Sequence, residues 1–225
     1  MFFVDDASAG AFASAVRERF GAVGEQVLLG PLGEERLVAG VKRLRAAGAR
    51  VLAGADTIAA APGCRHAATL LEVSAAELCS RPDAFLIEAF GNATLLVKAA
   101  TFDELAAALS LVPGALGASL YLAKDGRDDL AAPAIQRLLE TRTGRLVENR
   151  MPTGLAVTPP LQHGGPWPSA APPFFSAVGL PWSILRFARR ICFDGWSQPR
   201  LPECVRDAPP AGNPWRYVDQ AWTRG

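Results

Sequence analysis

Apolar side chains recur every four residues in an early segment of the chain. The positions concerned are Phe12, Val16 and Phe20. Arginine and glutamate lie between the last two, so one face of the segment is apolar and the rest is polar. This spacing predicts an amphipathic helix over residues 9–20, and a similar pattern predicts a second helix over residues 34–47.

Three further helices are predicted from local signals. Thr101 precedes Glu104 by three residues, which is the capping-box spacing that begins a helix. A short helix is expected over Ser74–Cys79, and a longer one over Asp128–Thr141.

Short β-prone or apolar runs separate these helices. They are Phe2–Val4, Arg50–Ala53, Thr69–Val73, Thr94–Lys98, Ala118–Ala123 and Arg145–Asn149. Helices that alternate with short buried strands indicate an α/β fold. We therefore expect three layers, with a twisted, mostly parallel sheet covered by helices on its faces.

The pattern of the chain changes after Met151. Proline and glycine crowd residues 151–181, which predicts a loop-rich C-terminal wrap over the domain. Ser183–Phe193 is predicted to form one projecting strand, and the proline-rich end of the chain is predicted to be an extended tail. The sequence thus predicts two domains, residues 1–180 and residues 181–225.

Composition excludes several classes of protein. The 23 basic residues and 22 acidic residues give a net charge of +1, so no basic excess is present to neutralise a nucleic-acid backbone. No apolar run reaches the roughly 18–20 residues of a membrane span. The first residues are acidic where a signal peptide would be basic. We expect a cytoplasmic protein that binds neither nucleic acid nor membrane.

The four cysteines, Cys64, Cys79, Cys192 and Cys204, form no C-x-x-C pair. Their spacing suits neither a zinc site nor a disulfide framework, so we expect reduced thiols and no bound metal. Cys64 lies two residues before His66, and a nearby base can activate a thiol. No third group is evident to orient this pair, so a structural role is favoured for both residues.

Several short motifs occur in a fixed order along the chain. They read Leu28-Leu-Gly-Pro-Leu, Ile87-Glu-Ala-Phe-Gly-Asn, Asn149-Arg-Met-Pro-Thr-Gly-Leu-Ala-Val, His163-Gly-Gly-Pro-Trp-Pro, Ser176-Ala-Val-Gly and Arg186-Phe-Ala-Arg-Arg-Ile-Cys-Phe. Their order and gaps resemble the C-terminal catalytic-domain half of the aldehyde dehydrogenase superfamily. The resemblance is greatest to the α-ketoglutaric semialdehyde (2,5-dioxopentanoate) dehydrogenase branch, and it covers nearly all of the chain.

This resemblance implies NAD(P)-dependent oxidation of an aldehyde to a carboxylic acid. In the family a cysteine thiolate attacks the aldehyde, an asparagine amide and a backbone N–H hold the oxyanion, and a glutamate activates water. In family order these residues and the dinucleotide-binding domain precede Met1, so we expect no catalytic residue here. Only Glu88 and Phe90 carry over, as vestigial contacts to the nicotinamide ribose and the nicotinamide ring.

The chain departs from the family pattern at some positions. Asn92 replaces a proline, which removes a fixed φ and is expected to loosen the loop that presents Glu88. Pro172-Pro-Phe-Phe-Ser replaces a polar and basic run, so the family's substrate does not transfer directly. His163 lies in a Gly-Gly-Pro loop, where a bond to local backbone is favoured over a role at a substrate entrance.

Three interpretations stay open. The chain is the C-terminal part of a split dehydrogenase that is inactive alone and binds a separate N-terminal half. Alternatively, it is a non-catalytic assembly or regulatory subunit that pairs with full-length paralogues, or with itself, through the strand Ser183–Phe193. In the third, the reading frame begins further upstream. The intact family member would bind NAD or NADP, and we expect this chain alone to bind neither.

Overall fold

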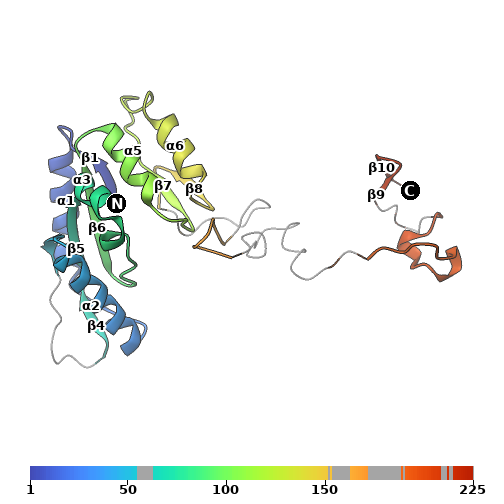
Figure 1. Ribbon diagram of the computed structural model, residues 1–225, viewed down its shortest axis with the longest axis horizontal. Coiled ribbons are helices and arrows are strands. Elements are labelled where there is room, and N and C mark those ends of the chain that lie inside the picture. The colour runs from blue at the N-terminus through green and yellow to red at the C-terminus, as the bar shows by residue number, and fades with distance from the viewer. Residues whose placement is uncertain are drawn as a thin grey trace. The chain divides into compact units, whose positions relative to one another are not determined.

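The computed structural model describes most of the N-terminal two thirds of the chain and parts of the remainder. The described residues are 1–54, 63–151, 153, 163–171, 189, 191–208, 212 and 215–224. The chain divides into two compact units, Met1–Ser183 and Ile184–Gly225, which are described separately (Figure 1). Among the described residues, no helix is both long enough and apolar enough to cross a membrane.

The first unit is built on a four-stranded sheet of order β1-β6-β5-β3. Strand β1 (Phe2–Val4) and strand β5 (Thr69–Ser74) both run parallel to β6 (Ala93–Ala99) between them. Strand β3 (Arg50–Ala53) is antiparallel to β5 at the other edge. The predicted α/β fold with a mostly parallel sheet is confirmed.

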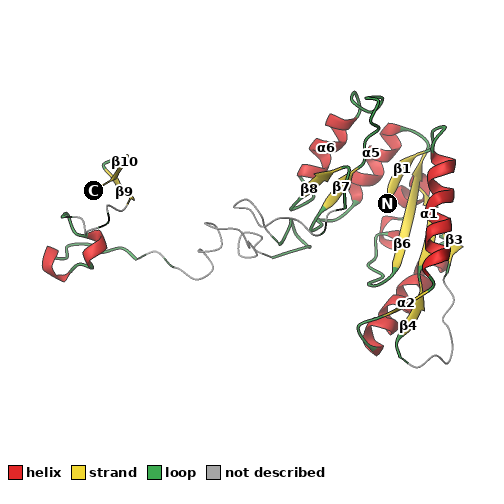
Figure 2. Cartoon of the chain, turned by 180° about the vertical axis from the view of Figure 1, so that it is seen from behind, coloured by secondary structure: helices red, strands yellow, loops and turns green. Residues whose placement is uncertain are grey.

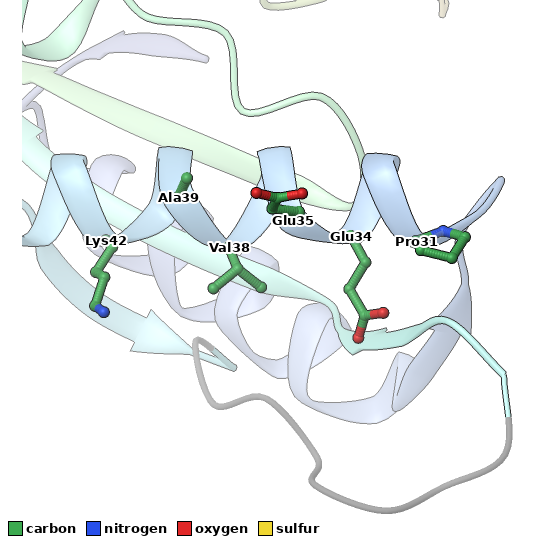
Figure 3. A pocket seen from close by; sticks show the side chains of 6 residues that line it. All are labelled: Pro31, Glu34, Glu35, Val38, Ala39 and Lys42. Carbon is green, nitrogen blue, oxygen red and sulfur yellow. The ribbon is translucent and has the colours of Figure 1, made fainter.

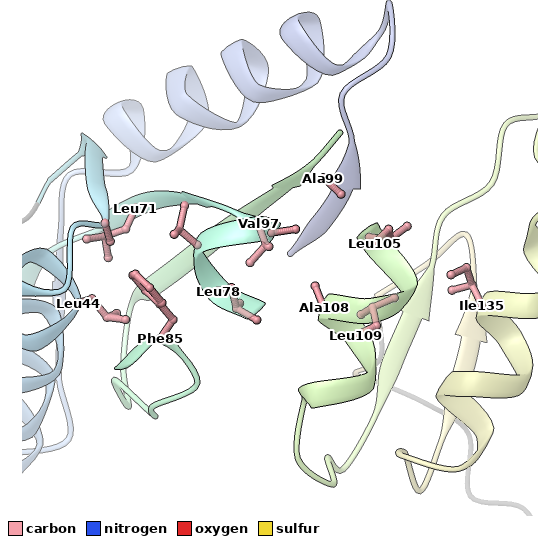
Figure 4. Close-up of a cluster of buried hydrophobic side chains, with 13 residues drawn as sticks. Leu44, Leu71, Leu78, Phe85, Val97, Ala99, Leu105, Ala108, Leu109 and Ile135 are labelled. Atoms are coloured by element: carbon pink, nitrogen blue, oxygen red, sulfur yellow. The ribbon is translucent and has the colours of Figure 1, made fainter. Parts of the chain in front are cut away.

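Helices pack on this sheet from both sides. Helix α1 (Ala9–Val23) contacts β3 and β5, and α5 (Phe102–Leu111) contacts β1 and β6 from the opposite side (Figure 4). Helix α3 (Ala75–Ser80) also contacts β5 and β6. The other helices among the described residues of this unit are α2 (Pro31–Ala46), α4 (Pro82–Phe85) and α6 (Ala132–Glu140).

Side-chain caps begin two of these helices, and the sequence predicts the one at Thr101. The hydroxyl of Thr101 accepts a hydrogen bond from the N–H of Glu104 at 3.2 Å. The hydroxyl of Ser74 accepts from the N–H of Glu77, also at 3.2 Å. Each cap satisfies a backbone donor that has no partner inside the helix.

The core lies between the sheet, α3, α5 and the facing sides of α2 and α6 (Figure 4). It consists of Leu44, Ala49, Leu71, Val73, Ala75, Leu78, Phe85, Val97, Ala99, Leu105, Ala108, Leu109 and Ile135. The central strands contribute nearly continuous apolar runs because both of their faces are covered. Burial of each large side chain stabilises the fold by about 1.5–3 kcal/mol relative to exposure.

Two smaller sheets occur among the described residues of the first unit (Figure 2). Strands β7 (Ala118–Leu120) and β8 (Leu146–Glu148) are parallel, while β2 (Glu25–Val27) and β4 (Arg65–Ala67) are antiparallel. The sequence analysis missed β2 and β4, since each is three residues long and carries polar or charged side chains.

The prediction was partly wrong where β7 leads toward α6. The strand ends at Leu120 rather than Ala123, and the helix begins at Ala132 rather than Asp128. The carboxylate of Asp128 accepts a hydrogen bond from the N–H of Ala123 at 2.6 Å. This side-chain bond holds a turn in the place where both regular elements were expected.

The second unit contains a hairpin where the sequence analysis predicts only an extended tail. Strand β9 (Trp215–Val218) pairs antiparallel with β10 (Ala221–Arg224). Asp219 and Gln220 have φ of 48° and 66°, as the two-residue turn of such a hairpin requires. The strand predicted over residues 183–193 lies mostly outside the described residues and stays a prediction.

Candidate functional site

The motif that contains Glu88 and Phe90 forms the connecting segment between α4 and β6, residues 86–92, which ends in a turn. Ile87 and Ala89 pack against the core, whereas the alternate side chains of Glu88 and Phe90 are exposed. Phe90 is 59% exposed, which is a large fraction for an aromatic side chain. The segment therefore exposes one carboxylate and one ring at the surface of the described unit.

Helix α2 supports this segment from behind. A β-carbon added at Gly40 would lie only 2.8 Å from Cβ of Ala89, so the helix and the segment approach as closely as a glycine permits. Gly91 has a φ of +150°, and a β-carbon there would lie 2.9 Å from a methyl group of Leu37. Two glycines thus allow the close packing that fixes the inner side of the segment.

Asn92 joins the segment to neighbouring strands. Its backbone carbonyl accepts a hydrogen bond from the N–H of Thr69 at 2.9 Å. Its side-chain Nδ2 donates to the backbone carbonyl of His66, in β4, at 2.7 Å. We expected Asn92 to loosen the loop because the family proline is missing, but its side chain adds a hydrogen bond that proline cannot make.

The carboxylate of Glu88 has no hydrogen bond or ion pair with any other described residue. An exposed carboxylate of this kind can accept two hydrogen bonds from a pair of neighbouring hydroxyl groups. The ring of Phe90 offers an apolar surface two residues further along the segment. A carboxylate and an aromatic ring are the two kinds of side chain that the sequence resemblance implies for contacts to the ribose and nicotinamide parts of NAD or NADP.

Cys64 and His66 do not form an activated pair. His66 is buried, and its Nδ1 lies 2.8 Å from the backbone carbonyl of Ala67. Burial raises the pKa of the Cys64 thiol, and the charge and hydrogen bond of Glu34 raise it further. A raised pKa favours the neutral thiol, which is the opposite of what a nucleophilic cysteine needs.

The other motifs are only partly described. His163 is exposed, but the next two glycines are buried: a β-carbon at Gly165 would lie 2.2 Å from the carbonyl oxygen of Ala115. Asn149 has a φ of 50°, and its side-chain oxygen accepts from the N–H of Leu122 at 2.8 Å. Residues 172–188, which include two of the motifs in part or whole, lie outside the described residues.

A shallow depression lies along one exposed side of α2 (Figure 3). Its lining residues are Pro31, Glu34, Glu35, Val38, Ala39 and Lys42. A single helix lines it, so nothing converges on a ligand from a second element. In the part of the chain that is described, no group of three His, Cys, Asp or Glu side chains could hold a metal ion.

The fold of the chain is shared with solved structures, among them an aldehyde dehydrogenase. A mutant of betaine aldehyde dehydrogenase from Staphylococcus aureus matches 73% of this chain and 33% of its own, with a TM-score of 0.56 and 14% identity. The protein Gox0499 matches 73% of this chain and 35% of its own, with a TM-score of 0.54 and 16% identity. At such low identities these matches establish the fold alone.

Curated sequences identify the relationship more closely. No protein-family model matches the chain. However, 156 residues, or 69% of the chain, are 35% identical to alpha-ketoglutaric semialdehyde dehydrogenase 2 of Azospirillum brasilense. The chain therefore belongs to the aldehyde dehydrogenase superfamily as a partial member.

Two curated relatives are named alpha-ketoglutaric semialdehyde dehydrogenases. A second one, from Acinetobacter baylyi, is 32% identical over 127 residues, or 56% of this chain. The match spans 29% of the length of the Azospirillum protein and 23% of the Acinetobacter protein. The branch that the motifs resemble is thus the one to which the curated relatives belong.

Proposed function

We propose that this chain is the C-terminal part of an NAD(P)-dependent aldehyde dehydrogenase that oxidises a 2,5-dioxopentanoate-type aldehyde to its carboxylic acid, and that it is inactive alone. The names of both curated relatives support the substrate class. The observation that carries the proposal is the outward pair formed by Glu88 and Phe90 on a segment otherwise packed into the core. A cytoplasmic location is part of the proposal.

Glu88 and Phe90 are the residues that would hold the cofactor. The carboxylate of Glu88 would accept hydrogen bonds from the nicotinamide ribose hydroxyls, and Phe90 would pack beside the nicotinamide ring. When bound, NAD or NADP supplies the hydride acceptor of the reaction. A charge-assisted hydrogen bond contributes about 1.5–3 kcal/mol, so the glutamate should have a measurable effect on nucleotide binding.

The partner in this proposal is a separate N-terminal dehydrogenase half, or a full-length paralogue. It would bring the nucleophilic cysteine, the oxyanion asparagine, the general-base glutamate and the dinucleotide-binding domain. Exposed apolar side chains support such a contact: Val27, Leu29 and Leu32 are 70%, 95% and 58% exposed. These residues flank Leu28 in the sequence. The side chain of Leu28 would lie 3.4 Å from a β-carbon added at Gly91, which directly follows Phe90, so the exposed apolar residues lie near the outward pair.

The proposal is tested by complementation. The purified chain is assayed with 2,5-dioxopentanoate and NAD or NADP, alone and after mixing with a separately produced N-terminal half of the Azospirillum relative. We expect turnover only in the mixture. Glu88→Gln should raise KM for the nucleotide about 10-fold or more, because a charge-assisted bond becomes a neutral one.

Glu35→Gln is the matched control, because Glu35 is another glutamate on the same unit, in the shallow depression on α2. It should leave the kinetics unchanged. Turnover by the chain alone would refute the expected inactivity, and no turnover in any mixture would refute the dehydrogenase assignment. Binding of the full-length relative without a change in turnover would favour the non-catalytic assembly subunit instead.

A further inference from the structure

The segment that carries Glu88 and Phe90 has few hydrogen bonds of its own. On its N-terminal side, the N–H of Leu86 donates to the carbonyl of Pro82 at 2.8 Å. Within the described part of the chain, no hydrogen bond involves the backbone of residues 87–91. The next residue with a hydrogen bond is Asn92. Hydrogen bonds therefore hold the two ends of the segment, and only side-chain packing holds the residues between them.

Asn92 has two bonds to elements that are distant in sequence. The carbonyl of Asn92 accepts from Thr69, and its Nδ2 donates to the carbonyl of His66 at 2.7 Å. His66 is 1% exposed and Thr69 is fully buried, so both partners lie in the interior of the unit. Of the two contacts, only the one through Nδ2 depends on the identity of the side chain.

Gly91 lies between this attachment and the outward pair. It precedes Asn92 directly and has a φ of +150°, a conformation that glycine reaches with little penalty and leaves as easily. Packing against α2 fixes only the inner side of the segment, so an anchor at the residue after Gly91 would further restrict the direction of Glu88 and Phe90. We propose that Asn92 is a positioning residue that, through its Nδ2 bond to the His66 carbonyl, sets the direction of Glu88 and Phe90.

This inference rests on the proposed function in one respect only, the identity of the molecule that the segment would bind. The ordering of the segment is a property of the chain alone, so it can be measured without a partner. A failed complementation would therefore refute the proposed function and leave the measurement below to decide the role of Asn92.

The test uses backbone amide NMR relaxation on the full chain. In the unaltered protein, residues 87–91 should have order parameters near the roughly 0.85 of rigid backbone, and Asn92→Leu should lower them below about 0.6. Loss of the Nδ2 bond, which contributes on the order of 1 kcal/mol, should make local opening at Asn92 easier. The amide of Thr69, which donates to the Asn92 carbonyl, should therefore exchange its hydrogen about fivefold faster. Amides in α5 should be unchanged, which controls for loss of fold.

Gln26→Leu is the matched control. Gln26 also carries an amide, whose Nε2 donates to the nearby carbonyls of Val23 and Glu25, and it pairs with His66 in the β2–β4 ladder. Its replacement removes an amide of the same chemistry without touching the segment. The order parameters of residues 87–91 should not change.

Asn92→Asp distinguishes the hydrogen bond from mere packing. A protonated carboxyl can donate to the His66 carbonyl, whereas the ionised form can only accept. The segment should thus be ordered at acid pH and lose order as the new carboxyl ionises, while the unaltered protein shows no such transition. Unchanged order in Asn92→Leu would overturn the inference, and so would the absence of any pH transition in Asn92→Asp.

Discussion

Replacing Gly40 by alanine would place a methyl group between α2 and the segment that carries the outward pair. The new β-carbon would lie 2.8 Å from Cβ and 3.0 Å from Cα of Ala89. Neither atom can rotate away, so the helix or the segment must shift. Overpacking of this kind costs about 1–3 kcal/mol. Because alanine favours the helix by about 1 kcal/mol over glycine, the net destabilisation should be about 1 kcal/mol.

The assay is urea denaturation of the full chain, followed by far-ultraviolet circular dichroism. With a urea dependence of about 2 kcal/mol/M, the midpoint of Gly40→Ala should fall by about 0.5 M. Gly33→Ala is the control, since Gly33 lies in the same helix and a β-carbon there would have no neighbour within 4 Å. It should stabilise the protein slightly. If both substitutions raised the midpoint equally, the close approach of α2 to Ala89 would be refuted.

Three further predictions concern local interactions. Thr101→Ala should lower the free energy of unfolding by about 1 kcal/mol, because α5 loses its cap; Thr101→Ser should restore most of it in the same urea assay. Glu34→Gln should lower the pKa of Cys64 and so speed its alkylation at a fixed alkaline pH, as followed by peptide mass spectrometry; an unchanged rate would contradict the assigned cause. Hydrogen bonds from Arg127 hold the pKa of Asp125 at about 2. Their stabilising effect on the fold is complete above the ordinary carboxyl pKa and is lost as the pH falls through 2. Arg127→Ala should raise the pKa of Asp125 in an NMR titration.

Most of the main sheet and its helices could be predicted because their patterns are strong. The apolar runs in β5 and β6 are buried on both faces, and the spacing of Phe12, Val16 and Phe20 continues through α1. The pair β2–β4 could not be predicted, because its pairing depends on contacts between residues about 40 positions apart, such as Glu25 with Ala67. Local sequence contains no signal for such a pairing.

The candidate site was recognised from resemblance, while its geometry required the structure. The motif names Glu88 and Phe90 but does not reveal that both point outward while their neighbours pack inward. Asn92 illustrates the limit most clearly. Sequence comparison with the family motif shows only that a proline is missing, whereas the structure shows the bond that its side chain forms with a residue 26 positions away.

Two different constraints therefore act on consecutive residues of one segment. Ile87 and Ala89 are explained by the core, because they pack against it and Ala89 fits the space left by Gly40. The same packing does not explain Glu88 and Phe90, which contribute an unpaired carboxylate and a largely exposed ring to the surface of the described unit. A segment needed only for folding would gain stability from a buried or a smaller residue at position 90. Packing within the described unit thus leaves the outward pair unexplained, and the proposed contact with the cofactor would account for it.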